Sequence, residues 1–195
     1  MDLIENRPMK SALKTPVIGI AGWKKSGKTA LTVRLIEEFT RRGLKVASIK
    51  HAHHEFQVDD QETDSARHRR AGAGEVVVVG GKRWAMMHEL KDEPEPNLDE
   101  IFTWLSPSDL VIVEGYKTAN IPKIEARRAT QQDRRFLAPN DPTIIAIASD
   151  HATDHGTLPL FSLDDIGGIA DFITRAVGVG LKASQPERTA ARPQS

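Results

Sequence analysis

The junction between residues 16–21 and 29–42 constrains this chain more than any other feature. The run PVIGIA at 16–21 is continuously apolar, which predicts a strand buried on both faces of a parallel sheet. In the segment 29–42 leucine and phenylalanine recur every four residues, which predicts a helix with one apolar face. The pattern Gly-x-x-x-x-Gly-Lys-Thr at 22–29 stands between them. A strand, a glycine-rich loop and a helix in this order predict the start of an α/β sheet.

The residue types at 22–29 suit the phosphates of a nucleoside triphosphate. Glycines allow successive backbone N–H groups to form a nest for phosphate oxygens, and the following helix directs its positive dipole end to the same anion. Lys28 can reach the β- and γ-phosphates, and the Thr29 hydroxyl is a ligand for Mg²⁺. The residues that we expect to bind the nucleotide here are Gly22, Trp23, Lys24, Lys25, Ser26, Gly27, Lys28 and Thr29.

The rest of the chain alternates strand and helix patterns. We predict strands at 45–51, 109–116 and 142–150, another within 121–128, a two-stranded hairpin at 75–90, and helices at 65–72, at 97–105 and after a Ser162 cap. Buried strands with short connections predict an α/β fold of the P-loop NTPase type. It has a mostly parallel sheet flanked by helices, and the hairpin forms an antiparallel edge.

A chain of 195 residues fits one domain best. The polar segment 1–15 predicts a flexible lead, and the nucleotide-binding domain then spans 16–180. The segment 181–195 is rich in Ala, Arg, Pro, Gln and Ser, which predicts a disordered tail.

The composition excludes several classes of protein. Lys plus Arg and Asp plus Glu both total 27, so no net field attracts nucleic acid or an acidic membrane. The absence of cysteine excludes disulfides, zinc thiolates and thiol catalysis. No apolar run approaches the roughly 18 residues of a spanning helix, and the N-terminal segment lacks a signal-peptide pattern. We therefore expect a cytoplasmic protein without nucleic-acid or membrane partners.

Glu114 is a candidate for a second part of the nucleotide site. Nucleotide-binding sheets of this kind carry an acidic residue at the end of a neighbouring strand, which positions Mg²⁺ through water. Glu114 follows the apolar run DLVIV and fits this place. The alternative is a solvated carboxylate at the end of a strand.

The histidines at 51, 53 and 54 raise the question of a metal site. Alternate residues of a strand point to the same face, so two imidazoles could lie together. No cysteine and no clear third ligand accompany them. A polar loop, or a loop near the nucleotide, is the plainer interpretation of these residues.

Four segments in this order resemble the molybdopterin-guanine dinucleotide biosynthesis adapter (MobB) family. They are GIAGWKKSGKTALTVRLI from residue 19, VASIKHAHHEF with VD at 46–59, TDSARHRRAGA at 63–73 and DLVIVEGYK at 109–117. The phosphate loop alone is shared by many proteins, whereas the ordered set is much more specific. The resemblance covers residues 16–175. The chain departs from the family pattern at 61–63, where QET replaces a frequent glycine-lysine pair, and at Ala30, which replaces a threonine.

The resemblance implies a GTP-binding homodimer with at most weak GTPase activity. Its implied partner is the guanylyltransferase that attaches GMP to molybdopterin to form the guanine dinucleotide cofactor. Carried over residue by residue, Thr29, Asp59 and Glu114 are the candidates for the Mg²⁺ region. We can assign no catalytic residue.

The source of guanine selectivity is a separate question. The Asn-Lys-x-Asp motif of many guanine-specific folds is absent, but Asp150 stands at a comparable strand end in IAIASD. We therefore take Asp150 as the candidate that reads the base. A carboxylate that caps the following turn is the alternative.

Two other functions stay open. A P-loop small-molecule kinase needs an acceptor pocket and lid arginines, which RHRR at 67–70 or EARR at 125–128 could supply. Solvated basic faces explain the same residues more simply. A metallochaperone GTPase is favoured only if the histidine cluster binds metal.

Overall fold

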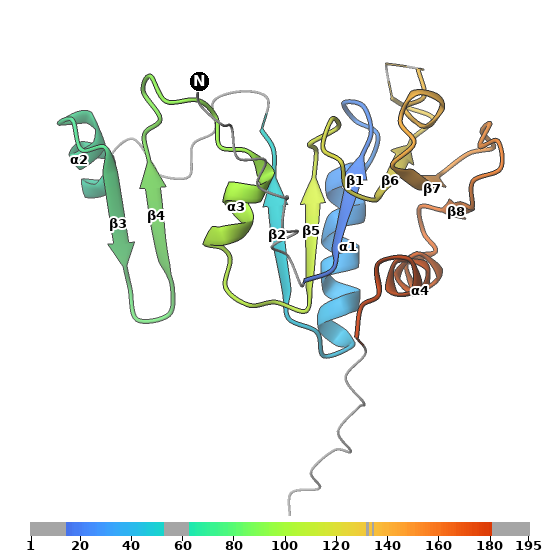
Figure 1. The fold of residues 1–195 in the computed structure, drawn as a ribbon, viewed down its shortest axis with the longest axis horizontal. Coiled ribbons are helices and arrows are strands. Elements are labelled where there is room, and N and C mark those ends of the chain that lie inside the picture. The colour runs from blue at the N-terminus through green and yellow to red at the C-terminus, as the bar shows by residue number, and fades with distance from the viewer. Residues whose placement is uncertain (1–14, 53–62, 132, 134, 181–195) are drawn as a thin grey trace, which may run out of the picture. The chain divides into compact units, whose positions relative to one another are not determined.

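The structure, a computed structural model, describes residues 15–52, 63–131, 133 and 135–180 (Figure 1). The chain divides into two compact units, one made of residues 52–104 and the other of the segments before and after them. The predicted lead, except Thr15, and the predicted tail at 181–195 lie outside the described residues. The single domain at 16–180 stays a prediction.

The larger unit contains a six-stranded sheet in which all neighbouring strands are parallel. Its strands are β1 (Val17–Ala21), β2 (Val46–Lys50), β5 (Leu110–Glu114), β6 (Lys123–Arg127), β7 (Ile144–Ser149) and β8 (Leu160–Ser162), in the spatial order β2-β5-β1-β6-β7-β8. This confirms the predicted parallel α/β fold. Because the strands run in the same direction, their carboxyl ends share one edge of the sheet, where ligands of such folds bind.

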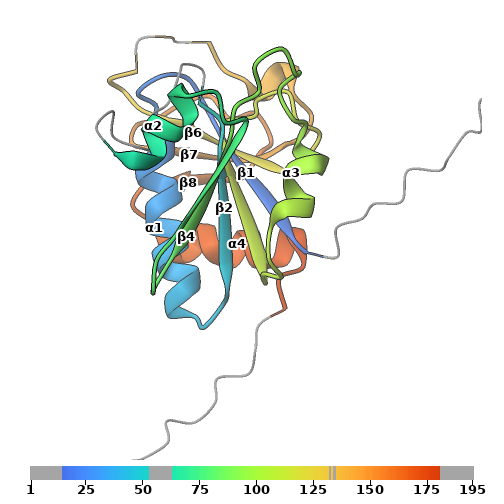
Figure 2. The ribbon, with the colours of Figure 1, turned by 90° about the vertical axis from the view of Figure 1, so that its left-hand side faces the viewer.

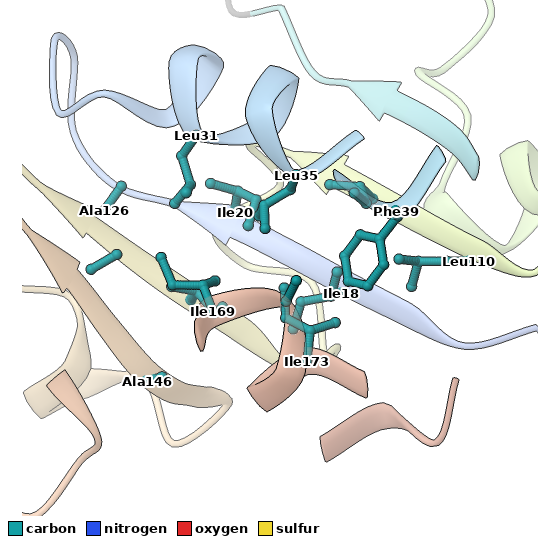
Figure 3. Packing of buried hydrophobic residues seen from close by; sticks show 14 of the residues in the cluster. Ile18, Ile20, Leu31, Leu35, Phe39, Leu110, Ala126, Ala146, Ile169 and Ile173 are labelled. Atoms are coloured by element: carbon teal, nitrogen blue, oxygen red, sulfur yellow. The ribbon is translucent and has the colours of Figure 1, made fainter. Parts of the chain in front are cut away.

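Helices α1 (Lys28–Arg41) and α4 (Ile166–Val177) pack against each other and against β1 (Figure 2). The predicted apolar face of α1 is confirmed, because Leu31, Leu35 and Phe39 are buried. Figure 3 shows these side chains meeting the isoleucines of β1 and α4 in one core. Burial of each such side chain contributes about 1.5–3 kcal/mol. The core therefore fixes the start of α1 against the end of β1.

The cap of α4 differs from our prediction. Asp165 rather than Ser162 is the N-cap, because its Oδ1 accepts the N–H of Gly168 at 3.0 Å. Ser162 is the last residue of β8, and its hydroxyl accepts the N–H of Asp164 at 3.2 Å. Serine and aspartate cap helices equally well, so the sequence pattern could not choose between two candidates three residues apart.

The smaller unit contains α2 (Asp64–Arg70), β3 (Glu75–Val79), β4 (Trp84–His88) and α3 (Leu98–Trp104). The predicted hairpin is confirmed, since β3 and β4 pair antiparallel with Val79 opposite Trp84. In the described residues these two strands form a sheet of their own. A capping box starts α3, because Asn97 and Glu100 exchange hydrogen bonds of 2.8 and 3.0 Å.

Among the described helices, none is long and apolar enough to cross a membrane.

Candidate nucleotide-binding site

The glycine-rich loop joins β1 to α1 at the carboxyl edge of the large sheet. Its backbone has positive φ at Gly22 (145°), Lys25 (66°) and Gly27 (92°), a region that favours glycine. A Cβ on Gly22 would overlap the Ser26 hydroxyl and lie 2.6 Å from the carbonyl oxygen of Ala126. The first glycine of the pattern is therefore required both by conformation and by space.

Ser26 supplies a polar atom that the protein leaves unsatisfied. Its side chain is fully buried, and its hydroxyl has no hydrogen-bond partner among the described residues. Leaving a buried polar group unpaired costs about 1–3 kcal/mol. A polar ligand in the loop would remove part of this cost.

Lys28 folds back over the loop. Its ammonium donates to the carbonyl oxygen of Trp23 at 2.7 Å. Burial, followed by the positive charges of Lys117 and Lys50, lowers the pKa of Lys28, while the Glu114 carboxylate acts in the opposite direction. Among the described residues, Lys28 thus interacts with two other lysines and one carboxylate. This excess of positive charge favours an anionic ligand.

Thr29 and Glu114 meet beside the loop. The Thr29 hydroxyl donates to Glu114 Oε1 at 2.6 Å. Glu114 ends β5 and pairs in register with Ile20 of β1, which brings it next to the start of α1. Lys50 Nζ lies 3.6 Å from the same carboxylate oxygen. The structure therefore brings together two of the three residues expected near Mg²⁺, and Asp59 lies outside the described residues.

Trp23 ties the loop to the segment before β7. Its indole N–H donates to the carbonyl oxygen of Arg135 at 2.7 Å. The Lys117 ammonium lies 4.0 Å from the ring centroid, and the Arg135 guanidinium lies 4.6 Å from it. Lys24 and Lys25 are exposed.

A cavity of about 520 Å³ lies beside the loop. Aromatic, cationic and amide side chains line it, among them Trp23, Lys117, Asn120, Arg135, Phe136 and Asn140. The sequence did not reveal this cavity, because its walls come from three separate segments.

Asp150 directly follows β7, as predicted. Its Oδ1 accepts the backbone N–H of Ala129 at 2.8 Å and lies 2.8 Å from Nδ1 of His151. Burial would raise the pKa of Asp150, but the hydrogen bonds from His151 and Ala129 outweigh it and hold the pKa below its usual value. These are contacts of a turn-stabilising carboxylate, and the reading of guanine stays a prediction.

Of the three histidines at 51, 53 and 54, the structure describes only His51. The His51 ring packs on Tyr116 with 4.5 Å between the ring centroids. His53 and His54 lie outside the described residues. Within the described segments, no group of three or more histidines and carboxylates could hold a metal ion.

The two arginines at the end of β6 have different surroundings. Arg127 is 1% exposed and pairs with Glu125 at 2.8 Å, while its guanidinium lies 3.8 Å from the Phe136 ring centroid. Arg128 is exposed and lies against Gly27. From the sequence we treated 125–128 as one basic segment. No sequence signal separates its arginines, because all five residues of β6 are buried and Arg128 lies just beyond the strand.

A parallel sheet whose central strand runs through this loop into a helix, with an acidic residue ending the adjacent strand, defines a P-loop protein. The family model of MobB, molybdopterin guanine dinucleotide synthesis protein B, matches residues 17–150. The chain therefore belongs to the MobB family.

Curated relatives agree with this family. The molybdopterin-guanine dinucleotide biosynthesis adapter protein of Escherichia coli is 36% identical over 160 residues, which cover 81% of this chain and 91% of the relative. The Haemophilus influenzae adapter protein is 38% identical over 161 residues, covering 81% and 87% of the two chains.

Solved structures show the same fold. A crystal structure of molybdopterin-guanine biosynthesis protein B matches with a TM-score of 0.63 and 27% identity, covering 83% of this chain and 99% of that one. The MobB homologue from Bacillus stearothermophilus matches with a TM-score of 0.62 and 24% identity, covering 84% and 99%.

Proposed function

We propose that this protein is a GTP-binding adapter that assists the guanylyltransferase attaching GMP to molybdopterin. Family membership gives the chain its role as an adapter in molybdopterin-guanine dinucleotide biosynthesis. The observation that carries the nucleotide part is the cluster at the loop. There the charges of Lys117, Lys50 and Glu114 all act on Lys28. Glu114 also accepts the hydroxyl of Thr29.

The residues of the loop fit a nucleotide with Mg²⁺. The backbone of 22–29 would hold phosphate oxygens, Ser26 offers an unsatisfied hydroxyl, and Lys28 offers the charge. Thr29 and Glu114 would hold the Mg²⁺ region together with Asp59. The metal would supply positive charge to the β- and γ-phosphates. We expect hydrolysis to be weak, because an adapter needs binding rather than turnover.

We also propose that the protein works as a homodimer through the hairpin. Val77, Val79, Trp84 and Met86 are 52–76% exposed on β3 and β4. A two-stranded sheet with such side chains on its surface is marginal by itself and favours association with another chain. The family resemblance implies a homodimer, and we therefore assign a second copy of the chain to this surface.

A small-molecule kinase is the second candidate. The cavity beside the loop, with Lys117 and Arg135 in its wall, could accept a small anionic substrate next to the nucleotide. This reading predicts nucleotide consumption that depends on an acceptor, whereas the adapter reading predicts slow hydrolysis without such dependence.

The deciding experiment is a binding titration that compares GTP with ATP, with and without the guanylyltransferase. We expect preference for GTP, and Lys28→Ala to weaken GTP binding about 10- to 100-fold because one charge-assisted contact is lost. Lys45→Ala is the matched control, since exposed Lys45 precedes the amino end of β2 at the opposite edge of the sheet. Unchanged GTP affinity in folded Lys28→Ala would contradict the proposal.

A further inference from the structure

The carboxyl end of β6 runs beside the phosphate loop. Ala21, the last residue of β1, pairs with Glu125 of β6, and the loop starts at Gly22. β6 continues beyond this level to Arg127. The chain after β6 therefore passes the loop itself rather than β1.

Arg128, the first residue after β6, lies against Gly27, the last glycine of the loop. A Cβ built on Gly27 would lie 3.0 Å from Nε and 3.5 Å from Cζ of Arg128. Gly27 is the N-cap of the 14-residue helix α1, so the guanidinium adds its charge near the positive end of the helix dipole. The Arg128 side chain is exposed, and its charge acts on the Asp150 carboxylate. Its neighbour Arg127, by contrast, is neutralised by Glu125.

The same segment is bonded to Asp150. The N–H of Ala129 donates to Asp150 Oδ1 at 2.8 Å, and the N–H of Asp150 donates to the carbonyl oxygen of Arg127 at 3.4 Å. Arg128 thus lies between the phosphate loop and Asp150, the residue that we expect to read the base. A nucleotide with its terminal phosphates in the loop and its base at Asp150 has its α-phosphate in this interval.

We propose that Arg128 binds the α-phosphate of the nucleotide. The inference rests on the proposed function and assigns a residue that lies outside the loop motif. A guanidinium can donate two parallel hydrogen bonds to phosphate oxygens and stays charged at every working pH. Lys28 binds the β- and γ-phosphates. The contributions of Lys28 and Arg128 to nucleotide affinity therefore depend differently on the number of phosphates in the ligand.

The test is calorimetric titration of Arg128→Gln with GTP, GDP and GMP. We expect an affinity loss of about 10- to 100-fold that is the same for all three ligands, because each carries the α-phosphate. Lys28→Ala weakens GTP and GDP far more than GMP. Arg175→Gln, an exposed arginine in the last turn of α4, is the matched control and leaves all three affinities unchanged.

Arg128→Lys separates charge from geometry. It keeps the charge but loses the planar fork, so we expect it to recover only part of the affinity. Because Arg128 is exposed, both variants should melt at the wild-type temperature.

The outcomes separate the inference from the function on which it rests. Wild-type affinities in Arg128→Gln overturn the inference alone, provided that Lys28→Ala loses GTP. A loss confined to GTP places the contact at the γ-phosphate and also overturns it. A wild-type protein that binds no guanine nucleotide refutes the proposed function, and the inference with it.

Discussion

Removing the Glu125 carboxylate should destabilise the protein more than any change at a surface ion pair. Glu125 and Arg127 are each 1% exposed and lie 2.8 Å apart. The carboxylate also accepts the N–H groups of Leu137 at 2.8 Å and Ala138 at 3.0 Å. In Glu125→Ala the guanidinium stays buried without its counter-charge, and two backbone donors lose their acceptor.

The expected loss in the free energy of unfolding is about 3–5 kcal/mol, the usual cost of breaking one side of a buried pair. Leu137 and Ala138 are only half-buried, so water can replace their lost bonds and we add nothing for them. A domain of this size has about 5–15 kcal/mol in total, so the variant should fold with little margin. Urea unfolding followed by circular dichroism measures the difference.

Two further variants serve as controls for this prediction. Glu125→Gln preserves the shape and an acceptor oxygen, and it should lose less than Glu125→Ala. Asp164→Ala breaks the Arg34–Asp164 pair, whose side chains are 41% and 89% exposed, and should cost only about 0–1 kcal/mol. The reasoning fails if Glu125→Ala costs no more than Asp164→Ala.

Three further predictions concern the selectivity for the nucleotide base, the formation of the dimer and the stability of the protein at acidic pH. Asp150→Asn should weaken GTP binding and strengthen XTP binding, because an amide donor opposes the guanine amine but suits the xanthine oxygen. Equal weakening of both ligands, or no effect on either, in a binding titration would leave Asp150 a turn residue. Trp84→Lys should turn a dimer into a monomer of 21.5 kDa in sedimentation, and a monomeric wild type at micromolar concentration would refute the dimer. Hydrogen bonds from Arg41 and Arg42 lower the pKa of Glu38 from 4.5 to about 2, so its contribution is present above pH 4.5 and lost as the pH falls towards 2. Wild type should therefore lose more stability over this range than Glu38→Gln, as acid titration of the melting temperature will show.

Local pattern determined the elements that depend on neighbours in the chain. The phosphate loop, the apolar face of α1 and the position of Glu114 at the end of β5 were all predictable, because each rests on periodicity or a short motif. Parallel strand direction then placed Glu114 and the loop at one edge. The contact of Thr29 with Glu114 follows from these facts once β5 lies beside β1.

Contacts between distant segments were decided only by tertiary structure. The order of strands sets β6 beside β1, and this alone separates buried Arg127 from Arg128 at the phosphate loop. No local rule ranks two adjacent arginines, because their free energies depend on a carboxylate or a loop brought near by the sheet. The anchoring of Trp23 to Arg135 has the same origin, since 112 residues separate the two in sequence.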